Sequence, residues 1–255
     1  MLSWAKANYL RRLLGTAIAF STFGLGGAAL GLVFPLLNGV TPTQQRQPLA
    51  RRTIHAAFIF FLRWMRALGI MEWQVEGIER LGRPGQLVIA NHPSLLYVVF
   101  IIAHIEQANC VVKGALLRNP FTRGPVRAAG FIANEVSETM LEQGAASLAQ
   151  GDCLIMFPEG TRTKPEQAIA FHRGAAALAL KAARHLTPVI IDVSPTTLTK
   201  NEKWYSIPPR KFKMTLRVAD DIDLTPYRSK GSAPIAARRL NADLTAFYTR
   251  ECHRG

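Results

Sequence analysis

One stretch of the sequence decides the fold: Asn-His-Pro-Ser-Leu-Leu-Tyr at residues 91–97. It follows the apolar run Leu87–Ala90, which is typical of a buried parallel strand. It precedes Val98–Ala103, which together with the two leucines of the stretch predicts a buried helix from Leu95. We therefore expect His92 where a strand ends and a helix begins, with the proline in the first helical turn. That position is the carboxyl edge of a sheet, where α/β folds place their chemistry.

A second polar stretch, Phe-Pro-Glu-Gly-Thr-Arg at residues 157–162, follows another strand-like run, Cys153–Met156. Two polar stretches that each end a strand of one α/β pattern are expected at the same edge of the sheet. A single histidine is more often structural than catalytic, because imidazoles have many other roles. The presence of the second stretch favours a functional role for His92, and we interpret the two stretches as one functional site.

The second stretch has the composition of a site for an anion or a lipid headgroup. Arg162 offers a planar fork of donors that suits phosphate, and Gly160 allows close approach by backbone or substrate. Glu159 is expected either to orient Arg162 or to bind an acceptor hydroxyl, and Thr161 belongs to the same substrate-binding group. The alternative is a turn at a helix start that carries a solvated ion pair.

Taken together, the Asn-His start and the unbroken Phe-Pro-Glu-Gly-Thr-Arg resemble the glycerolipid acyltransferases, the lysophospholipid acyltransferase family, over about residues 70–200. The resemblance implies an enzyme that moves a fatty acyl group from acyl-CoA or acyl-carrier protein to a lysophospholipid-like acceptor, with His92 as the general base. In this family the residue five positions after the histidine is Asp, which orients the imidazole and stabilises its charged form. This sequence has Tyr97 at that position.

Acyl transfer by direct attack fits these residues. The acceptor hydroxyl attacks a thioester carbonyl, a histidine takes its proton, and backbone N–H groups at a helix start stabilise the oxyanion. With a reference pKa of about 10, Tyr97 is expected to be neutral, and losing the carboxylate of a comparable pair costs on the order of 10⁴ in turnover. A phenol oxygen can still accept a hydrogen bond from the ring of His92. The carboxylates that could substitute are Glu135, Glu138 and Asp152.

Further substrate-binding candidates come from the resemblance. Asn91 opens the first motif, and Lys113 fits the position of a lysine that helps to hold the acceptor phosphate in the family. In the family, an arginine just after a Phe-Ile pair also helps to hold the acceptor phosphate. This sequence has Asn134 at that position, which opens the possibility of an acceptor without phosphate. Arg173, in Phe-His-Arg-Gly at residues 171–174, resembles polar lining of the site. A membrane-facing basic surface is an equally weighted interpretation of the arginines around Lys113.

An uncharged segment near the start of the chain predicts contact with a membrane. Residues 13–37 lack charged side chains and are long enough to cross a hydrocarbon core. Basic residues flank both ends, so the segment either spans the membrane or enters and returns on one face. Residues 54–70 predict a second helix, at headgroup level or in the core, with residues 38–50 as the connecting loop. The spacing of Gly27 and Gly31 would let another helix approach closely.

The rest of the chain alternates strand-like and helix-like patterns, which predicts an α/β fold with a largely parallel sheet flanked by helices. We expect strands at residues 73–75, 86–90, 110–112, 130–133, 153–157, 189–193 and 212–218. We expect helices at residues 95–105, 137–148, 174–185 and 234–248. Residues 1–70 would form an N-terminal membrane-associated helical platform, and residues 71–255 the α/β acyltransferase domain.

The composition narrows the class of partner. The 255 residues carry a formal net charge of +14, which favours an acidic partner such as a membrane surface or an acyl-carrier protein. No nucleic-acid fold signature accompanies this charge. The three cysteines have no metal-binding spacing and are interpreted as buried apolar residues. We expect no metal and no cofactor besides the thioester co-substrate, and a location on the cytoplasmic face of the inner (plasma) membrane; the oligomeric state stays open.

The leading hypothesis is therefore a membrane-associated O-acyltransferase whose activity is impaired by Tyr97. One alternative is a non-catalytic protein that binds lipid or acyl-carrier protein, and another is an acyltransferase for a lipid acceptor without phosphate. A weaker third idea is a basic scaffold on the membrane surface, which would need neither motif.

Overall fold

A computed structural model of the chain describes residues 4–92, 94, 96–135, 137–160, 169–199, 202–229 and 232–252. The strands in these residues are β1 (Met71–Glu76), β2 (Gln86–Ala90), β3 (Ala108–Val112), β4 (Ile132–Ala133), β5 (Cys153–Met156), β6 (His185–Ser194) and β7 (Phe212–Val218). They form one seven-stranded sheet in the order β1-β7-β6-β2-β5-β3-β4. Every neighbouring pair is parallel except β6 with β7. The expected α/β fold with a largely parallel sheet is confirmed.

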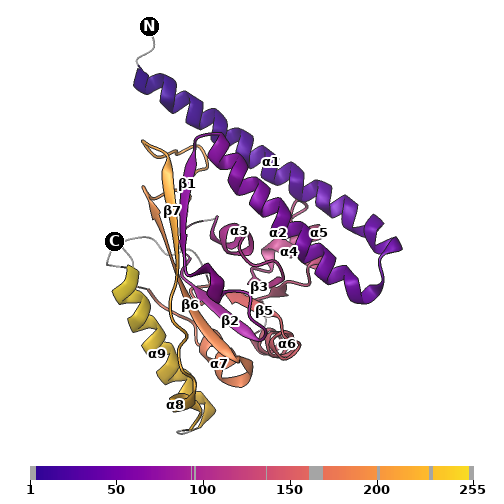
Figure 1. The fold of residues 1–255 in the computed structure, drawn as a ribbon, viewed down its shortest axis with the longest axis vertical. Coiled ribbons are helices and arrows are strands. Elements are labelled where there is room, and N and C mark those ends of the chain that lie inside the picture. The colour runs from indigo at the N-terminus through magenta and orange to yellow at the C-terminus, as the bar shows by residue number, and fades with distance from the viewer. Residues whose placement is uncertain are drawn as a thin grey trace.

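Helices cover both faces of this sheet, as Figure 1 shows. Their bounds are α1 (Trp4–Val40), α2 (Thr43–Ala67), α3 (Tyr97–Ile102), α4 (Ala115–Arg118), α5 (Arg123–Ala128), α6 (Ser137–Ala149), α7 (Gly174–Ala182), α8 (Thr225–Arg228) and α9 (Ala233–Cys252), with one 3₁₀ turn, η1 (Ile78–Arg80). The core on one face joins the sheet to α1, α2, α3 and α5, and the core on the other face joins it to α6, α7 and α9.

The central strand β2 explains why the chain forms this sheet. All of its side chains are buried. Because successive side chains of a strand point to opposite faces, Leu87 and Ile89 enter the core with α7 and α9, whereas Val88 and Ala90 enter the core with α1 to α3. A continuous apolar run is what a strand buried on both faces requires.

Several expected boundaries differ from those of the structure, and two of them have clear physical causes. Residues 38–50 were predicted to be a loop, but only Thr41 and Pro42 separate α1 from α2. The Gln- and Arg-rich start of α2 contains good helix formers, and its Ala50 and Arg51 are buried against the sheet domain, so tertiary packing extends the helix through Pro48. The helix expected at 174–185 ends at Ala182, because β6 begins at His185 to pair with β2.

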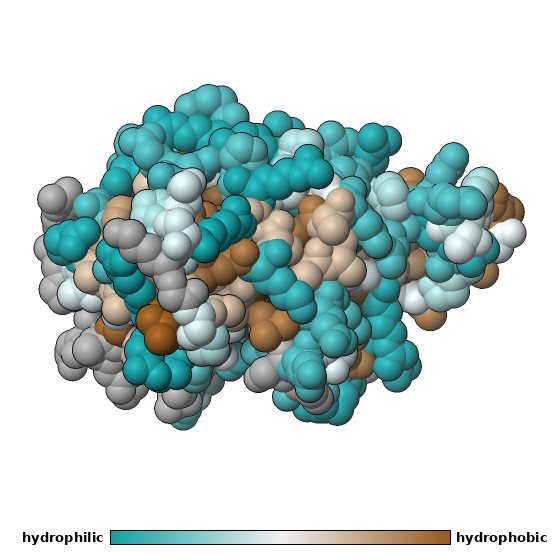
Figure 2. Space-filling view, turned by 90° about the horizontal axis from the view of Figure 1, so that it is seen from below, coloured by the Kyte–Doolittle hydropathy of each residue, from teal (hydrophilic) through white to brown (hydrophobic). Residues whose placement is uncertain are grey.

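α1 is long and apolar enough to cross a membrane by length and composition, and it is the one such helix among the described residues. Its outward side is strongly exposed, with Leu32, Leu36 and Val40 at 74%, 76% and 84%. In Figure 2, hydrophobic residues lie at the protruding right-hand end, which is the turn of the α1–α2 hairpin in Figure 1. The N-terminal helix is therefore a candidate membrane anchor.

The inward side of α1 packs on the protein itself. A Cβ atom on Gly27 would lie 2.3 Å from the carbonyl oxygen of Phe121, and one on Gly124 would lie 2.3 Å from the Cα atom of Gly31. No side chain fits into such a space. Of the two glycines of α1 that predict close approach of a helix, Gly31 thus meets α5 and Gly27 meets the segment just before it.

Candidate functional site

The two motifs meet at the carboxyl edge of the sheet. β2 and β5 are parallel neighbours, and the segments that follow them are joined by a hydrogen bond. The backbone N–H of His92 donates to Oε1 of Glu159 at 2.8 Å, and Glu159 is 5% exposed. A buried carboxylate of the second motif therefore fixes the backbone of the first.

The position of His92 relative to the helix differs from the expectation. α3 begins at Tyr97, so His92 does not stand in the first helical turn. Its backbone N–H is engaged by Glu159 and does not serve as an oxyanion donor in this arrangement. Pro93 and Leu95, which were expected to start the helix, lie outside the described residues.

Asn91 extends the sheet through its side chain. Its Nδ2 atom donates to the carbonyl oxygen of Ile191, and its Oδ1 atom accepts from the N–H of the same residue, both at 2.8 Å. The two hydrogen bonds continue the pairing of β2 with β6 past Ala90. Asn91 is buried and does not line the cavity beside His92. Its geometry is that of a residue that positions His92.

Gly160 turns the second motif tightly against a neighbouring segment. Its φ of +63° lies in the left-handed region, which glycine adopts without steric cost. A Cβ atom here would lie 3.1 Å from the ring of His172, whose own backbone N–H donates to the carbonyl oxygen of Pro158 at 2.8 Å. Thr161 and Arg162, the expected headgroup-binding pair, lie outside the described residues.

Tyr97 is fully buried below His92. Their ring centroids are 6.4 Å apart, and the phenolic oxygen has no hydrogen-bond partner within the described parts of the chain. The expected hydrogen bond between this oxygen and the imidazole is thus not formed. Burial, followed by the charges of Asp192 and Glu159, raises the pKa of Tyr97 well above its ordinary value. The phenol is therefore neutral and cannot compensate an imidazolium charge.

The carboxylates proposed as substitutes for the missing Asp lie elsewhere. Glu135 is paired with Arg118, and Glu138 is exposed in the first turn of α6. Asp152 directly precedes β5, at the opposite edge of the sheet, where it pairs with Arg51. The positions of these carboxylates in the sequence did not reveal how far they lie from His92 in the fold. Among the described residues, no cluster of three or more His, Cys, Asp or Glu side chains could hold a metal ion.

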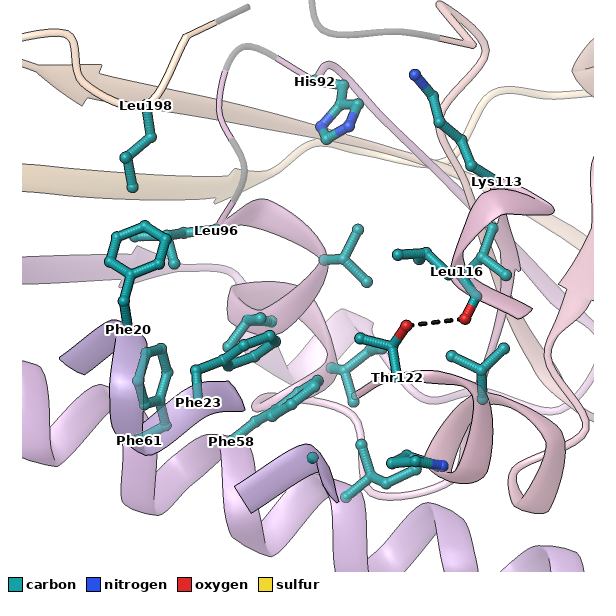
Figure 3. A pocket seen from close by; sticks show the side chains of 18 of the residues that line it. Phe20, Phe23, Phe58, Phe61, His92, Leu96, Lys113, Leu116, Thr122 and Leu198 are labelled. Atoms are coloured by element: carbon teal, nitrogen blue, oxygen red, sulfur yellow. Dashed lines mark hydrogen bonds between the residues drawn. The ribbon is translucent and has the colours of Figure 1, made fainter. Parts of the chain in front are cut away.

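A cavity of about 1040 Å³ opens beside His92, and its walls are mostly apolar. The ring of His92 contacts that of Phe157 at 4.8 Å between centroids. In Figure 3, His92 stands at one end, and aromatic side chains from the two N-terminal helices line the space below it. These are Phe20 and Phe23 of α1 and Phe58 and Phe61 of α2.

Sequence reasoning missed this aromatic wall. Residues 54–70 are predicted as a helix at headgroup level or in the core, and nothing in the spacing of their aromatic residues shows that they face a cavity that ends at His92. The available signal was the spacing of Gly27 and Gly31, since these glycines let α1 pack closely on α5 and the segment before it.

The remaining candidates differ in their relation to the cavity. Lys113 follows β3 and lies at the same end of the cavity as His92 in Figure 3, and Asn134, which follows β4, also lines the cavity. Arg173 precedes α7, is exposed, and does not line the cavity. Its neighbour His172 is also exposed and lines the cavity.

The fold and the site define an α/β enzyme class in which a histidine stands at the end of an apolar, lipid-sized cavity under an N-terminal helical hairpin. The comparisons with known proteins sharpen this class. A family model described as "Acyltransferase" matches residues 72–192, which contain both motifs. Over these residues, a little under half of the chain, the protein is similar to the acyltransferase family, and the comparisons support an acyltransferase enzyme.

Two curated relatives carry the same name, 1-acyl-sn-glycerol-3-phosphate acyltransferase. The protein from Pseudomonas aeruginosa is 29% identical over 74% of this chain and 72% of its own length. The protein from Helicobacter pylori is 24% identical over 99% of this chain and 98% of its own length. The crystal structure of the 1-acyl-sn-glycerophosphate acyltransferase from Thermotoga maritima has the same fold, with a TM-score of 0.72 over 97% of this chain and 98% of that one at 19% identity.

Proposed function

We propose that this protein transfers a fatty acyl group from an acyl-CoA or acyl-carrier-protein thioester to the free hydroxyl of a 1-acyl-glycerol-3-phosphate or a similar lysolipid. The observation that carries the proposal is the position of His92 at the end of an apolar cavity of about 1040 Å³, which is at the upper end of the range of about 300–1,000 Å³ for small-molecule sites. The names of the two curated relatives support the same acceptor class.

The reaction needs no covalent enzyme intermediate. The acyl chain lies in the cavity between α1, α2 and α3, which places the thioester carbonyl beside the imidazole. His92 removes the proton of the acceptor hydroxyl as its oxygen attacks the carbonyl carbon. The tetrahedral intermediate collapses with loss of the thiolate, which takes the proton from the imidazolium. Lys113, at the same end of the cavity, attracts the acceptor phosphate.

Tyr97 makes this form of the enzyme slow. The imidazolium that forms during attack is stabilised by a carboxylate in comparable sites, and here a neutral, buried phenol stands in that position. Glu159 is the carboxylate that touches the first motif, but its Oε1 atom binds the backbone N–H of His92. It holds the histidine in place without neutralising the ring through that contact.

The way α1 packs supports a location on one face of a membrane. Gly15 approaches Ile70, Gly27 approaches Phe121, and Phe34 is 3% exposed, so the helix contacts the protein at both ends of its apolar part. A helix held in this way lies along one membrane face more readily than it crosses the bilayer. The net charge of +14 favours the anionic cytoplasmic face of the inner membrane.

A second candidate function is lipid or acyl-carrier binding without turnover. One observation favours it. The reaction needs a negative charge beside His92, but the group at that position is the fully buried hydroxyl of Tyr97, which has no hydrogen-bond partner in the described structure. In that case the cavity would still hold an acyl chain, but His92 would have no catalytic task.

The test is transfer from radiolabelled acyl-CoA and acyl-carrier protein to a panel of lysolipids with and without phosphate, measured for the protein and for His92→Ala. Activity that falls by about 10²–10⁴ in His92→Ala supports the proposal. Equal activity in both proteins overturns the role of His92. Tight binding of acyl chains with no transfer from either protein to any acceptor favours the second candidate function.

A further inference from the structure

The cavity has a second polar region, away from His92, that the proposed reaction does not use. Its lining includes Arg12 of α1 and Arg210 of the segment between β6 and β7, together with Trp204 of the same segment. We propose that this region binds the phosphate of a single-chain or double-chain membrane amphiphile whose tail lies in the cavity.

The fold brings together the two segments that carry these arginines. A Cβ atom on Gly15, one turn after Arg12, would lie 3.0 Å from Cγ2 of Ile70. The carbonyl oxygen of Ile70 accepts a hydrogen bond of 3.2 Å from the N–H of Phe212, two residues after Arg210. Ile70 therefore links the turn of α1 that carries Arg12 to the strand start that follows Arg210.

This region is separated from His92 along the sheet. Ala90 at the end of β2 pairs with Val189 of β6, and β6 continues from there to Ser194, which pairs with Lys213 at the start of β7. The side chain of Asn91, next to His92, pairs with Ile191, so the three further residues of β6 up to Ser194 correspond to roughly 10 Å. The tops of β1 and β7 in Figure 1 accordingly reach the first half of α1, beyond the end of β2. The cavity thus has a basic end distinct from its histidine end.

The two arginines at this end lack acidic partners among the described residues. The Nε atom of Arg12 is buried and has no hydrogen-bond partner in the described part of the chain. Neither Arg12 nor Arg210 forms an ion pair with any described carboxylate. Glu159, at the other end, is the one carboxylate that lines the cavity among the described residues. An anion with several acceptor oxygens fits such a pair of guanidinium groups.

The surroundings indicate that the anion belongs to a lipid. Trp204 packs on Phe20 of the apolar wall at 6.1 Å between ring centroids, yet it remains 44% exposed, and Tyr205 beside it is 46% exposed. Exposed Trp and Tyr rings next to basic residues are typical of the headgroup level of a membrane. An amphiphile can thus place its phosphate at this rim and its tail against Phe20 and Phe23.

The test is a binding titration of the full-length protein in uncharged detergent, with no acyl donor present. The ligands are 1-oleoyl-glycerol-3-phosphate, monooleoylglycerol with the same tail, and inorganic phosphate. The readout is intrinsic tryptophan fluorescence, which is repeated in Trp204→Phe to assign the change to this end of the cavity. Because no reaction takes place, the outcome does not depend on the acyl-transfer proposal.

The double variant Arg12→Gln, Arg210→Gln should bind the phospholipid about tenfold more weakly, the factor that corresponds to one charge-assisted hydrogen bond. Its affinity for monooleoylglycerol should not change. The matched control is Arg184→Gln, Arg238→Gln, which removes two exposed charges outside the cavity lining and should leave all affinities as they are.

Three results would overturn the proposal. Equal losses for both lipids would mean that the arginines only support the fold of the cavity. Equal losses in the test and control variants would mean that the effect is general electrostatic attraction. Binding of inorganic phosphate as tight as that of the phospholipid would show a free-anion site in place of a lipid site.

Discussion

At the amino edge of the sheet, a buried network satisfies its own polar groups. Arg51 of α2 donates to Asp152 at 2.6 Å and to the carbonyl oxygen of Ala129 at 3.0 Å, and Ser147 donates to the second oxygen of Asp152 at 2.6 Å. At the carboxyl edge, by contrast, the buried hydroxyl of Tyr97 has no hydrogen-bond partner within the described residues. The first edge is built for stability, and the second holds unsatisfied groups where the reaction would occur.

This contrast teaches where substitutions should act. A change at the amino edge breaks completed hydrogen bonds, so it should lower the free energy of unfolding and leave the chemistry of the folded molecules alone. A change at the carboxyl edge should act on turnover, and removal of an unsatisfied group there should even stabilise the fold. The predictions below test this division, in order of expected free-energy change.

The largest effect is expected for Tyr97→Asp. A carboxylate at this buried position beside His92 would stabilise the imidazolium, and turnover should rise by up to about 10⁴. The free energy of unfolding should fall by about 2–5 kcal/mol, because a large buried side chain is lost. The measurement is kcat for acyl transfer, normalised to the folded fraction at low temperature.

The matched control for this change is Tyr97→Asn, which has nearly the same shape as Asp but no charge. Asn should give no such gain in kcat. If both variants gain equally, space and not charge limits the reaction. If neither gains, the replacement of the family's carboxylate is not what limits turnover in this protein.

Next in size is Arg51→Met at the amino edge. The substitution leaves Asp152 without its cation, and we expect the free energy of unfolding to fall by about 3 kcal/mol, at the lower end of the range for a broken buried ion pair. The matched control is the next residue, Arg52→Met, whose ion pair with Glu106 is exposed at 65% and 60% and should contribute less than about 1 kcal/mol. Chemical unfolding of both variants in the same detergent measures the difference.

The kcat of folded Arg51→Met should remain within about twofold of the unchanged protein. A large loss of kcat without a loss of stability would contradict the division between the two edges. It would mean that a shift of α2 at Arg51 also displaces the aromatic side chains of α2 that line the cavity.

A smaller effect on turnover is expected at Glu159. Glu159→Ala removes the acceptor that fixes the backbone N–H of His92, and displacement of a catalytic group by about 1 Å can cost on the order of 10² in rate. Glu159→Gln keeps an oxygen that can accept the same hydrogen bond, so it should retain most of the kcat. A steady-state comparison of the three proteins tests this. Equal, severe losses in Ala and Gln would show that the charge of Glu159 matters more than its position.

The fold was predictable from the sequence because its strands are buried on both faces. A short apolar run such as Leu87–Ala90 is typical of a strand in the middle of a sheet that is covered on both faces. The alternation of such strands with helices then identifies the α/β fold class. Boundaries were less predictable. The α2 start at residues 43–50 is polar, and it becomes helical because Ala50 and Arg51 dock on the rest of the protein, which the local sequence does not record.

The site was predictable only as far as its motifs reach. The two motifs could be placed on one edge, because both follow parallel strands. The hydrogen bond between His92 and Glu159 could not be predicted, because it joins a backbone N–H to a side chain that is 67 positions away in the sequence. The wall of the cavity comes from α1 and α2, whose aromatic residues look the same in a sequence whether they face lipid or substrate.

The smallest effect, and the sharpest test of the contrast, is expected for Tyr97→Phe. The change removes only the hydroxyl, which is buried and has no partner among the described residues. Because a buried, unsatisfied hydroxyl costs free energy, the variant should be more stable by about 1 kcal/mol. At the amino edge, removing the hydroxyl of Ser147, which accepts from Asn109 at 2.8 Å and donates to Asp152, should instead destabilise the protein by about 1 kcal/mol. Thermal unfolding of Tyr97→Phe and Ser147→Ala in parallel compares the two edges directly.

The same variant tests the ionisation state of Tyr97. Burial and the nearby charges of Asp192 and Glu159 raise the pKa of this phenol well above its ordinary value. A raised pKa keeps an acid protonated, so the phenol should remain neutral from acidic pH up to at least about pH 10. The pH–rate profile of Tyr97→Phe should therefore superimpose on that of the unchanged protein. A lost alkaline limb would mean that the phenolate takes part in the reaction, and a loss of stability in both Tyr97→Phe and Ser147→Ala would mean that the hydroxyl of Tyr97 has a hydrogen-bond partner.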